Sequence, residues 1–315
     1  MSRVLVTGAS GFIGRHTLTP LLDAGLEVHA VSSRATPSDV PAAVRWHRAD
    51  LLADGAAAEL LARVRPSQLL HLAWHTEPGR FWTASANLDW VQASVGLLRA
   101  FGEQGGRRAV LAGTCAEYEW QQSTHCLELD TPERQATPLR PATLYGASKH
   151  GLHVVCEAWA RQWGVALAWG RVFHLYGPFE HPARLAAQAI GALLRGEHVA
   201  CTHGRQVRDL LYAPELASAF VALLLSDVRG AVNLASGEPV RVAELLAEIG
   251  AATGHPELLR LGARSLAPGE PQRLTADVQR LRGEVGWAPA VGLREGIART
   301  VDWWRQTYAR AGAPV

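Results

Sequence analysis

The sequence predicts an α/β fold in which a parallel sheet is covered by helices on both faces. Three observations lead to this prediction. Short apolar runs alternate with longer segments of helical periodicity over the first 172 residues. The first run, Arg3–Thr7, leads directly into the glycine-rich segment Gly8–Gly14 and then into a helical pattern. With 315 residues, the chain is also long enough for a large core. Together these features predict a Rossmann-type, doubly wound parallel sheet.

The glycine-rich segment suits the pyrophosphate of a dinucleotide. Gly8 allows a tight turn, Gly11 lets the backbone approach phosphate, and Gly14 lets the next helix pack close to the strand. The N-terminus of that helix offers free N–H groups and a partial positive charge to an anion. Three glycines also fit an ordinary turn, but the strand before them and the helix after them favour dinucleotide binding. The expected contacts are Gly8, Ser10, Gly11, Phe12, Ile13 and Gly14.

The end of the second expected strand, Leu26–Ser33, indicates which dinucleotide binds. A site for NAD usually places an acid here to accept from the ribose 2′-hydroxyl. This chain has Ser33 and Arg34 instead, which suit a 2′-phosphate. Arg15 is a further candidate for that phosphate, and Arg34 is alternatively a solvated loop residue. We predict NADP as the cofactor, with NAD as the alternative.

Four more strands are expected in this half of the chain. They are Val44–Ala49, Gln68–Ala73, Ala109–Gly113 and Val165–Val172, with helices at Asn87–Phe101 and Tyr145–Trp163. Asp50 and Leu51 follow the first of them, where an acid caps a turn or accepts from an adenine amino group. Leu72 and Ala73 would pass beside the cofactor. The long polar segment 117–141 is expected to be a functional loop.

The pattern changes after Val172. The segment 174–182 is expected to be a loop, and short strands at Asp209–Tyr212 and Ala231–Ala235 alternate with helices near 184–194, 214–225 and 293–308. No second glycine fingerprint is present. We predict that residues 1–172 form the dinucleotide-binding domain, with its sheet completed by segments near 206–235. Residues 173–315 mainly form a smaller mixed α/β lobe that binds the substrate.

Tyr145 and Lys149 lie four residues apart at the start of an expected helix and therefore share one face. A free tyrosine titrates near pH ~10, and a nearby ammonium lowers that pKa. Lys149 also suits the hydroxyls of the nicotinamide ribose, and Thr114 supplies a hydroxyl at the end of the fifth strand. Such a trio moves a proton on or off a carbinol oxygen while a hydride moves at the carbon. A tyrosine–lysine pair is common on helix surfaces, but its place in a dinucleotide fold favours catalysis.

Segments over almost the whole chain resemble the extended short-chain dehydrogenases/reductases, the group of nucleotide-sugar epimerases, dehydratases and reductases. The resemblance rests on Gly8–Gly14, His71–Ala73, Thr114 with Tyr118, Pro141–Lys149, Arg171–Pro178, Arg208–Asp209, Asn233–Glu238 and Gly286–Pro289.

This resemblance implies a catalytic site and a mode of assembly. The implied catalytic residues are Thr114, Tyr145 and Lys149, and Tyr145 and Lys149 also contact the cofactor. The resemblance implies nicotinamide contacts near Val172 and His174 and a diphosphate contact from Arg208. It also implies a homodimer through the two long helices expected at Asn87–Phe101 and Tyr145–Trp163.

Two substrate positions depart from the family pattern. His174 stands where the family usually has asparagine. The family's arginine before a Pro-Gly-acid turn has no match before Pro268–Glu270, where Arg264 and Arg273 are only neighbours. The candidates for substrate binding are Thr114, Cys115, His174, Arg208 and Arg273.

The residues after Thr114 argue against dehydratase chemistry. Sugar 4,6-dehydratases carry an acid pair there, whereas this chain has Cys115 and Ala116. Glu117 comes one position late, and a structural role is favoured. A thiol at Cys115 suits acid–base work in epimerisation, but a small buried apolar residue is the favoured interpretation. His174 and His181 are further candidate proton carriers because both lie in an expected loop.

Composition argues against several kinds of partner. The net charge is only +2 and no dense basic run occurs, which argues against nucleic acid. No apolar run is long enough to cross a membrane. Four scattered cysteines show no metal or redox spacing, so we predict reduced thiols, no metal and a cytoplasmic location. The chain opens on a strand, so no signal peptide is expected.

Three functions are consistent with these features. The first is NADPH-dependent reduction of a 4-keto nucleotide sugar, with Tyr145 donating the proton. The second is a nucleotide-sugar epimerase that keeps its NAD(P) tightly bound. The third is a non-catalytic protein that senses NADP, which the intact Thr114, Tyr145 and Lys149 disfavour.

Overall fold

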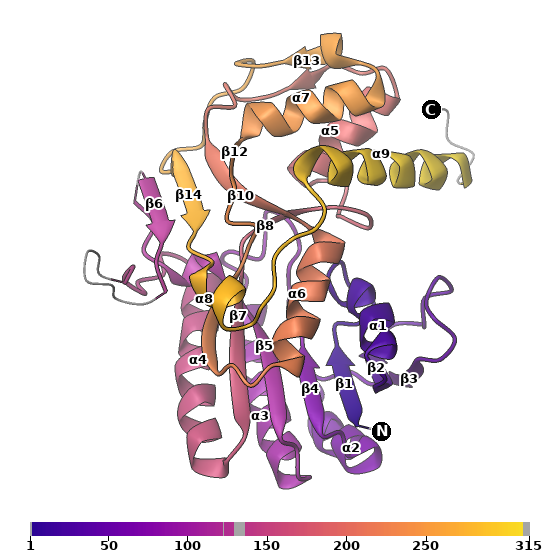
Figure 1. Cartoon of the computed structure of the whole chain (residues 1–315), viewed down its shortest axis with the longest axis vertical. Coiled ribbons are helices and arrows are strands. Elements are labelled where there is room, and N and C mark those ends of the chain that lie inside the picture. The colour runs from indigo at the N-terminus through magenta and orange to yellow at the C-terminus, as the bar shows by residue number, and fades with distance from the viewer. Residues whose placement is uncertain (1, 122, 129–135, 311–315) are drawn as a thin grey trace.

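Seven parallel strands form the main sheet of the computed structural model, which describes residues 2–121, 123–128 and 136–310 (Figure 1). In spatial order they are β3 (Arg45–Arg48), β2 (Glu27–Ser32), β1 (Arg3–Thr7), β4 (Gln68–His71), β5 (Arg108–Thr114), β7 (Ala166–Val172) and β11 (Gly230–Leu234). Each neighbouring pair runs parallel. The predicted doubly wound α/β fold is therefore confirmed.

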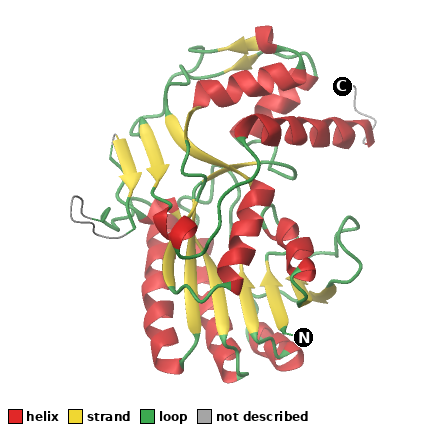
Figure 2. Cartoon of the chain, in the orientation of Figure 1, coloured by secondary structure: helices red, strands yellow, loops and turns green. Residues whose placement is uncertain are grey.

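Helices cover both faces of this sheet (Figure 2). One face packs against α1 (Gly14–Asp23) and α6 (Ala213–Leu225), and the other against α2 (Ala56–Val64), α3 (Ala86–Glu103) and α4 (Leu144–Trp163). All seven residues of β5 are buried, as expected for a strand covered on both sides.

The strand order places a crevice at the carboxyl ends of the main strands, next to β1. The chain goes from β1 to β2 in one direction and later to β4 on the other side of β1. Connections leave the carboxyl ends of β1 and β4 in opposite directions, and ligands of open α/β sheets bind at such a point. The glycine-rich segment follows β1 and therefore lies in this crevice.

A smaller sheet lies above the carboxyl ends of the main strands (Figure 1). It contains β6 (Ser123–Cys126), β8 (His174–Tyr176), β10 (Val207–Tyr212), β12 (Pro239–Arg241) and β14 (Arg273–Ala276). Two expected loops are therefore wrong in part, since β6 pairs with β14 and β8 with β10. Both strands are short and pair only with distant segments, which local periodicity does not reveal. Residues 122 and 129–135 of the expected loop 117–141 lie outside the described residues.

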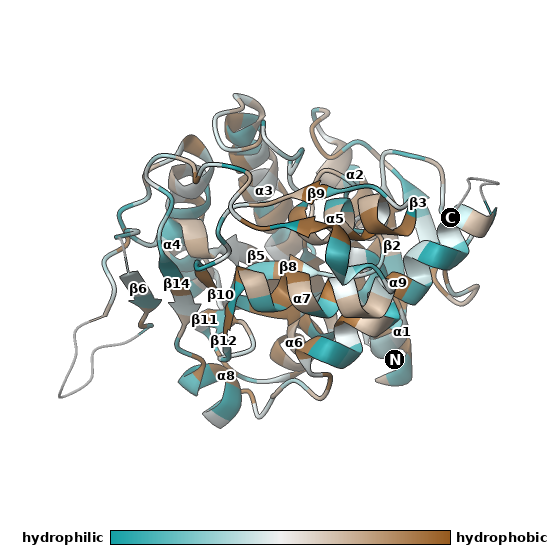
Figure 3. Cartoon of the chain, turned by 90° about the horizontal axis from the view of Figure 1, so that it is seen from above, coloured by the Kyte–Doolittle hydropathy of each residue, from teal (hydrophilic) through white to brown (hydrophobic). Residues whose placement is uncertain are grey.

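Three helices close the second lobe: α5 (Leu185–Leu194), α7 (Val242–Thr253) and α9 (Leu293–Arg310). They surround an apolar core that includes Ile190, Leu246 and Trp304. Figure 3 looks down on this lobe, and its helices carry both apolar and polar residues. The short pair β9 (Val199–Ala200) and β13 (Leu259–Arg260) and the turn η2 (Pro256–Leu258) complete it. The short helix α8 (Gln279–Gly283) packs instead on the main sheet beside β11. Among the described residues, no helix combines the length and apolar character that spanning a membrane requires.

The chain passes between the two sheets more than once. Of the segments near 206–235, Gly230–Leu234 joins the main sheet as β11, whereas Val207–Tyr212 joins the smaller sheet as β10. Conversely, β6 comes from the first half of the sequence and lies in the smaller sheet. Each half of the sequence therefore contributes a strand to the other lobe. The predicted domain boundary near residue 172 stays a proposal.

Candidate active site

A cleft of about 1140 Å³ runs from the glycine-rich segment, across the carboxyl ends of the main strands, to the second lobe. The candidate site residues that line it are Gly8, Ser10, Gly11, Phe12, Ile13, Gly14, Ser33, Arg34, Asp50, Leu51, Leu72, Ala73, Thr114, Cys115, Tyr145, Lys149, Val172, His174 and Arg208. Arg273 lies on β14 and is not among the described residues that line the cleft.

The glycine-rich segment is packed so closely that side chains would not fit. Gly8 has φ +66°, and a Cβ there would lie 2.7 Å from the backbone nitrogen of Ala73. A Cβ on Gly14 would overlap the carbonyl of Gly8, and one on Gly11 would lie 3.1 Å from the same oxygen. The glycines therefore allow the turn to lie close against the loop after β4 and the start of α1 to lie close against the turn. The geometry fits a dinucleotide.

Thr7 fixes the loop that faces the glycines. Its Oγ1 accepts hydrogen bonds from the backbone N–H groups of Leu72 and Ala73, each at 3.1 Å. The same hydroxyl donates a hydrogen bond to Nδ1 of His71 at 2.6 Å, and the other ring nitrogen donates to Ser94 at 2.8 Å. Burial lowers the pKa of His71 to about 3, so the ring is neutral. His71 is therefore a structural bridge between β1, β4 and α3.

The ribose end of the cleft carries a free guanidinium. Ser32 Oγ lies 3.2 Å from Ser10 Oγ and accepts from the backbone N–H of Arg34 at 3.1 Å. The side chain of Arg34 is exposed and makes no hydrogen bond or ion pair within the described part of the chain. Arg15, by contrast, pairs with Asp39 at 3.2 Å and lies 3.5 Å from the ring centre of Phe179.

Asp50 caps a turn. Its Oδ1 accepts from the backbone N–H of Leu52 at 3.1 Å, which matches one of its two expected roles. Its second expected role, toward an adenine amino group, stays a prediction.

Tyr145 and Lys149 occupy the first turns of α4. The helix begins after Thr143, whose side chain accepts from the N–H of Gly146 at 3.1 Å. Tyr145 and Thr114, the last residue of β5, both line the cleft. The phenol therefore lies at the carboxyl end of the sheet, where the Thr114 hydroxyl influences its pKa.

Lys149 is held by a backbone carbonyl and an indole ring. Its Nζ donates to the carbonyl of Ala112 at 2.8 Å and lies 3.6 Å from the ring centre of Trp74. Burial lowers the pKa of Lys149 to about 7. Burial also raises the pKa of Tyr145 above its ordinary value, while the nearby Thr114 hydroxyl acts in the opposite direction. The pKa of Tyr145 is therefore raised and not lowered as expected, because desolvation dominates.

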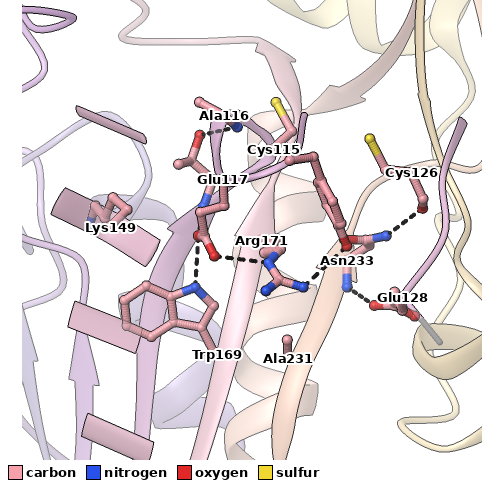
Figure 4. Close-up of polar contacts among 12 residues, drawn as sticks. Cys115, Ala116, Glu117, Cys126, Glu128, Lys149, Trp169, Arg171, Ala231 and Asn233 are labelled. Carbon is pink, nitrogen blue, oxygen red and sulfur yellow. Dashed lines mark hydrogen bonds and ion pairs between the residues drawn. The ribbon is translucent and has the colours of Figure 1, made fainter. Parts of the chain in front are cut away.

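The Glu117 carboxylate accepts hydrogen bonds from Trp169 and Arg171 (Figure 4). The carboxylate is fully buried, and Oε1 accepts from Thr114 N and Trp169 Nε1, each at 2.8 Å. Oε2 accepts from Nε of Arg171 at 2.9 Å. Glu117 lies outside the cleft and has the structural role that the sequence favours.

The hydrogen bonds of the Glu117 carboxylate argue against metal binding at one cluster of potential ligands. Glu117, His150 and His153 have ligand atoms within 4.8 Å of one another, and neither ring nitrogen of His153 has a partner. However, both Glu117 oxygens already accept hydrogen bonds, and Arg171 places a positive charge beside them. A further cation there would be repelled, so we assign this group to packing.

The second lobe contributes the other side of the cleft. Arg208 is 7% exposed and pairs with Glu270 at 2.8 Å. His174 has an unpartnered Nδ1, and burial lowers its pKa to about 3. Burial raises the pKa of Cys115 to about 12, so it is a thiol at neutral pH. His181 is exposed and does not line the cleft, unlike the other candidate proton carriers.

Several cleft residues were not expected from the sequence. They are Trp74, Phe81, Trp82, Trp120, Glu180 and Arg184. A usable signal existed for three of them, because Trp74, Phe81 and Trp82 cluster directly after the end of an expected strand. Glu180 is 5% exposed, and its Oε2 has no hydrogen-bond partner.

Comparisons with known proteins agree with this geometry. The family described as "NAD dependent epimerase/dehydratase family" matches residues 4–235. The chain is 29% identical to the UDP-glucose 4-epimerase of Azospirillum brasilense, over 99% of this chain and 95% of that protein. It is similar to the structure of the Thermus thermophilus UDP-glucose 4-epimerase complex with NAD, with TM-score 0.83 and 28% identity over 96% of this chain and 99% of that one. MoeE5 in complex with UDP-glucuronic acid and NAD gives TM-score 0.80 and 28% identity over 97% and 100%. The chain therefore belongs to the NAD-dependent epimerase/dehydratase family.

Proposed function

We propose that this protein interconverts a secondary alcohol and a ketone on the sugar of a nucleotide sugar, with NAD(P) as the redox partner. The observation that carries this proposal is that the Thr114 and Tyr145 pair lines the same cleft as the glycine-rich segment. A sensor of NADP has no need of such a pair, which argues against the non-catalytic alternative.

The residues divide the work as follows. NAD(P), when bound, accepts or returns a hydride at the sugar carbon. Tyr145 moves the proton at the oxygen on that carbon, and Thr114 orients the phenol. Because burial raises the pKa of Tyr145, the phenol is neutral and suited to donate a proton. Lys149 would present its remaining N–H groups to the ribose hydroxyls of a bound cofactor.

We place 4-epimerisation first among the specific reactions. It is supported by the relatives described above that carry this activity in their names, one of them with 95% of its length covered. The absence of the dehydratase acid pair after Thr114 also favours it, because Cys115 and Ala116 cannot supply that acid and base. Over a whole cycle the hydride returns to the same carbon, so no cofactor is consumed.

Reduction of a 4-keto nucleotide sugar is the second candidate. Two observations favour it: the unpaired guanidinium of Arg34 at the ribose end, which suits NADPH, and the neutral phenol of Tyr145. In this reaction the cofactor is consumed once per turnover.

One experiment tests the proposal and separates the candidates. The purified protein is incubated with UDP-glucose, UDP-galactose and the corresponding 4-keto sugars, with NAD or NADPH present. An epimerase forms the C4 epimer without a net change in absorbance at about 340 nm, whereas a reductase steadily removes the absorbance of the reduced cofactor. Failure to transform UDP-, GDP-, CDP- and dTDP-sugars alike would contradict the proposal.

We assign the diphosphate of the substrate to the second lobe. Arg208 and Arg184 both line the cleft there, and the N-terminus of α5 adds a partial positive charge. Since Arg208 pairs with Glu270, the diphosphate must displace this carboxylate. We expect Arg208→Gln to weaken binding of UDP about 10-fold or more, as for loss of one charge-assisted hydrogen bond.

Cofactor choice is tested at Arg34. If its guanidinium pairs with a 2′-phosphate, Arg34→Ala should remove ~1–3 kcal/mol of preference for NADPH over NADH. Dissociation constants for both cofactors, measured by fluorescence on both proteins, check this. Equal constants in the unaltered protein would contradict the preference for NADPH, and tighter binding of NADH would favour NAD, the cofactor present in the similar structures described above.

We also propose a homodimer that buries α3 and α4. These neighbouring helices expose large apolar side chains: Leu88 (57%), Val95 (37%), Val154 (52%) and Val155 (53%). Exposed apolar groups gathered on adjacent helices are typical of an interface with another protein surface.

A further inference from the structure

The loop between β4 and α3, residues 72–85, contacts both Tyr145 and Lys149. Trp74, Phe81 and Trp82 come from this loop, and all three line the cleft. The first touches Lys149 and the other two touch Tyr145.

Lys149 is restrained from two sides. It is the only lysine of the chain and is 4% exposed. The carbonyl of Ala112 accepts from Nζ at 2.8 Å, and the Trp74 ring centre lies 3.6 Å from the same nitrogen. A cation over an indole face is attracted by the ring, more strongly when water is excluded. These contacts leave the cleft as the open direction for the remaining N–H groups.

Trp74 is itself held in place. Its Nε1 donates to Oδ1 of Asn87 at 2.8 Å. Asn87 is fully buried, and its Nδ2 donates to the carbonyls of Phe81 and Ala84, each at 2.8 Å. One amide therefore ties the start of the loop to its end, and the indole has little freedom to leave Lys149.

The other end of the loop packs on Tyr145. The rings of Phe81 and Trp82 stand nearly perpendicular to the tyrosine ring, with centroids 4.9 and 5.8 Å away. The carbonyl of Trp82 accepts from the backbone N–H of Tyr145 at 3.1 Å. Edge-to-face packing of this kind favours one ring orientation.

We propose that the loop 72–85 is a positioning element for the tyrosine–lysine pair, in which Trp74 holds the ammonium of Lys149 beside the cofactor end of the cleft. Trp74 acts through Lys149 and is a positioning residue. The contact between Trp74 and Lys149 does not depend on which reaction the protein catalyses. Its effect on cofactor binding rests on the proposed function.

The single lysine makes the contact directly measurable. Protein labelled with ¹³C-lysine gives one set of lysine signals, all from Lys149. The ring current of Trp74 should shift the ε-CH₂ protons upfield. Trp74→Leu removes the ring and should return this signal toward the position of free lysine. Trp74→Phe keeps a ring while losing the hydrogen bond to Asn87, and should preserve much of the upfield shift.

A matched tryptophan serves as the control. Trp163 lies on α4, the helix that carries Lys149, and is 56% exposed. Trp163→Leu should leave the Lys149 signal unchanged. A wild-type signal at the free-lysine position, or one that Trp74→Leu does not move, would overturn the proposal.

Cofactor affinity gives the second measurement. We expect Trp74→Leu to weaken binding of NAD and NADP about 10-fold, while Trp74→Phe changes it much less. Rescue by phenylalanine would show that the ring, and not the bulk of the loop, matters. If the unaltered protein binds neither cofactor, the proposed function fails and the Lys149 signal still decides the contact. If it binds and Trp74→Leu binds equally well, the positioning role fails.

Discussion

Tyr145 is the side chain on which the proposed chemistry depends. Its ring packs against Phe81 and Trp82, so Tyr145→Phe keeps the packing and removes only the hydroxyl. We expect kcat to fall ~10²–10⁴-fold, the usual contribution of a general acid or base, with little change in cofactor affinity. Steady-state kinetics and cofactor titration check this. A variant with near-normal kcat would shift the proton transfer to another group, such as His174 or Cys115.

Glu180 makes stability depend on pH in a definite direction. Burial raises its pKa to about 8 from an ordinary value of 4.5. As pH rises through this window, the unfolded chain releases the proton while the folded chain retains it, so this carboxyl lowers stability progressively. Glu180→Gln removes the titration. Relative to the unaltered protein, the variant should gain a few kcal/mol between pH ~5 and ~9, since each pKa unit corresponds to about 1.4 kcal/mol.

Thermal melts of both proteins at these two pH values test this expectation. Taking the difference between variant and parent cancels the titration of other groups. The same difference in Tm at both pH values would contradict the effect of burial on Glu180.

At the scale of elements, the turn from β1 to α1 is the most constrained. A Cβ on Gly14 would overlap the carbonyl of Gly8. This carbonyl belongs to the backbone, so it cannot rotate away as a flexible side chain would. Gly14→Ala must therefore push α1 away from β1. We expect it to cost ~1–3 kcal/mol of stability and to abolish NAD(P) binding.

Gly96 provides the control for this substitution. It lies within α3, and a Cβ there would meet no atom within 4 Å. Gly96→Ala should be neutral or stabilise by about 0.5–1 kcal/mol, because alanine favours helix. Chemical denaturation and cofactor titration of the two variants distinguish steric overlap from a general effect of a methyl group.

At the scale of the whole molecule, the exposed side chains of α3 and α4 predict assembly. Val154 is 52% exposed, and Val154→Arg would place two like charges in a twofold interface. We expect the unaltered protein to have the mass of a dimer in solution and the variant that of a monomer. Light scattering after size-exclusion chromatography measures this. A monomeric parent, or a variant that remains dimeric, would contradict the proposed interface.

The sequence by itself determined the features that depend on local chemistry. Alternating strands and helices specified the parallel sheet, since its central strands are short apolar runs covered on both faces. The glycines of the first turn were recognisable because backbone packing there excludes side chains. Spacing along one helix placed Tyr145 and Lys149 on a common face, and the end of β5 placed Thr114 beside the tyrosine.

Only the tertiary structure decided which distant groups meet. The strand β6 forms because it pairs with β14, about 150 residues later in the chain. No local sequence pattern predicts that pairing. Lys149 turns to Ala112 and Trp74, and Arg208 meets Glu270, because loops from separate strands converge on the cleft. Burial at that convergence also reversed the expected shift in the pKa of Tyr145. Desolvation depends on everything that surrounds a side chain, and those surroundings are assembled from the whole chain.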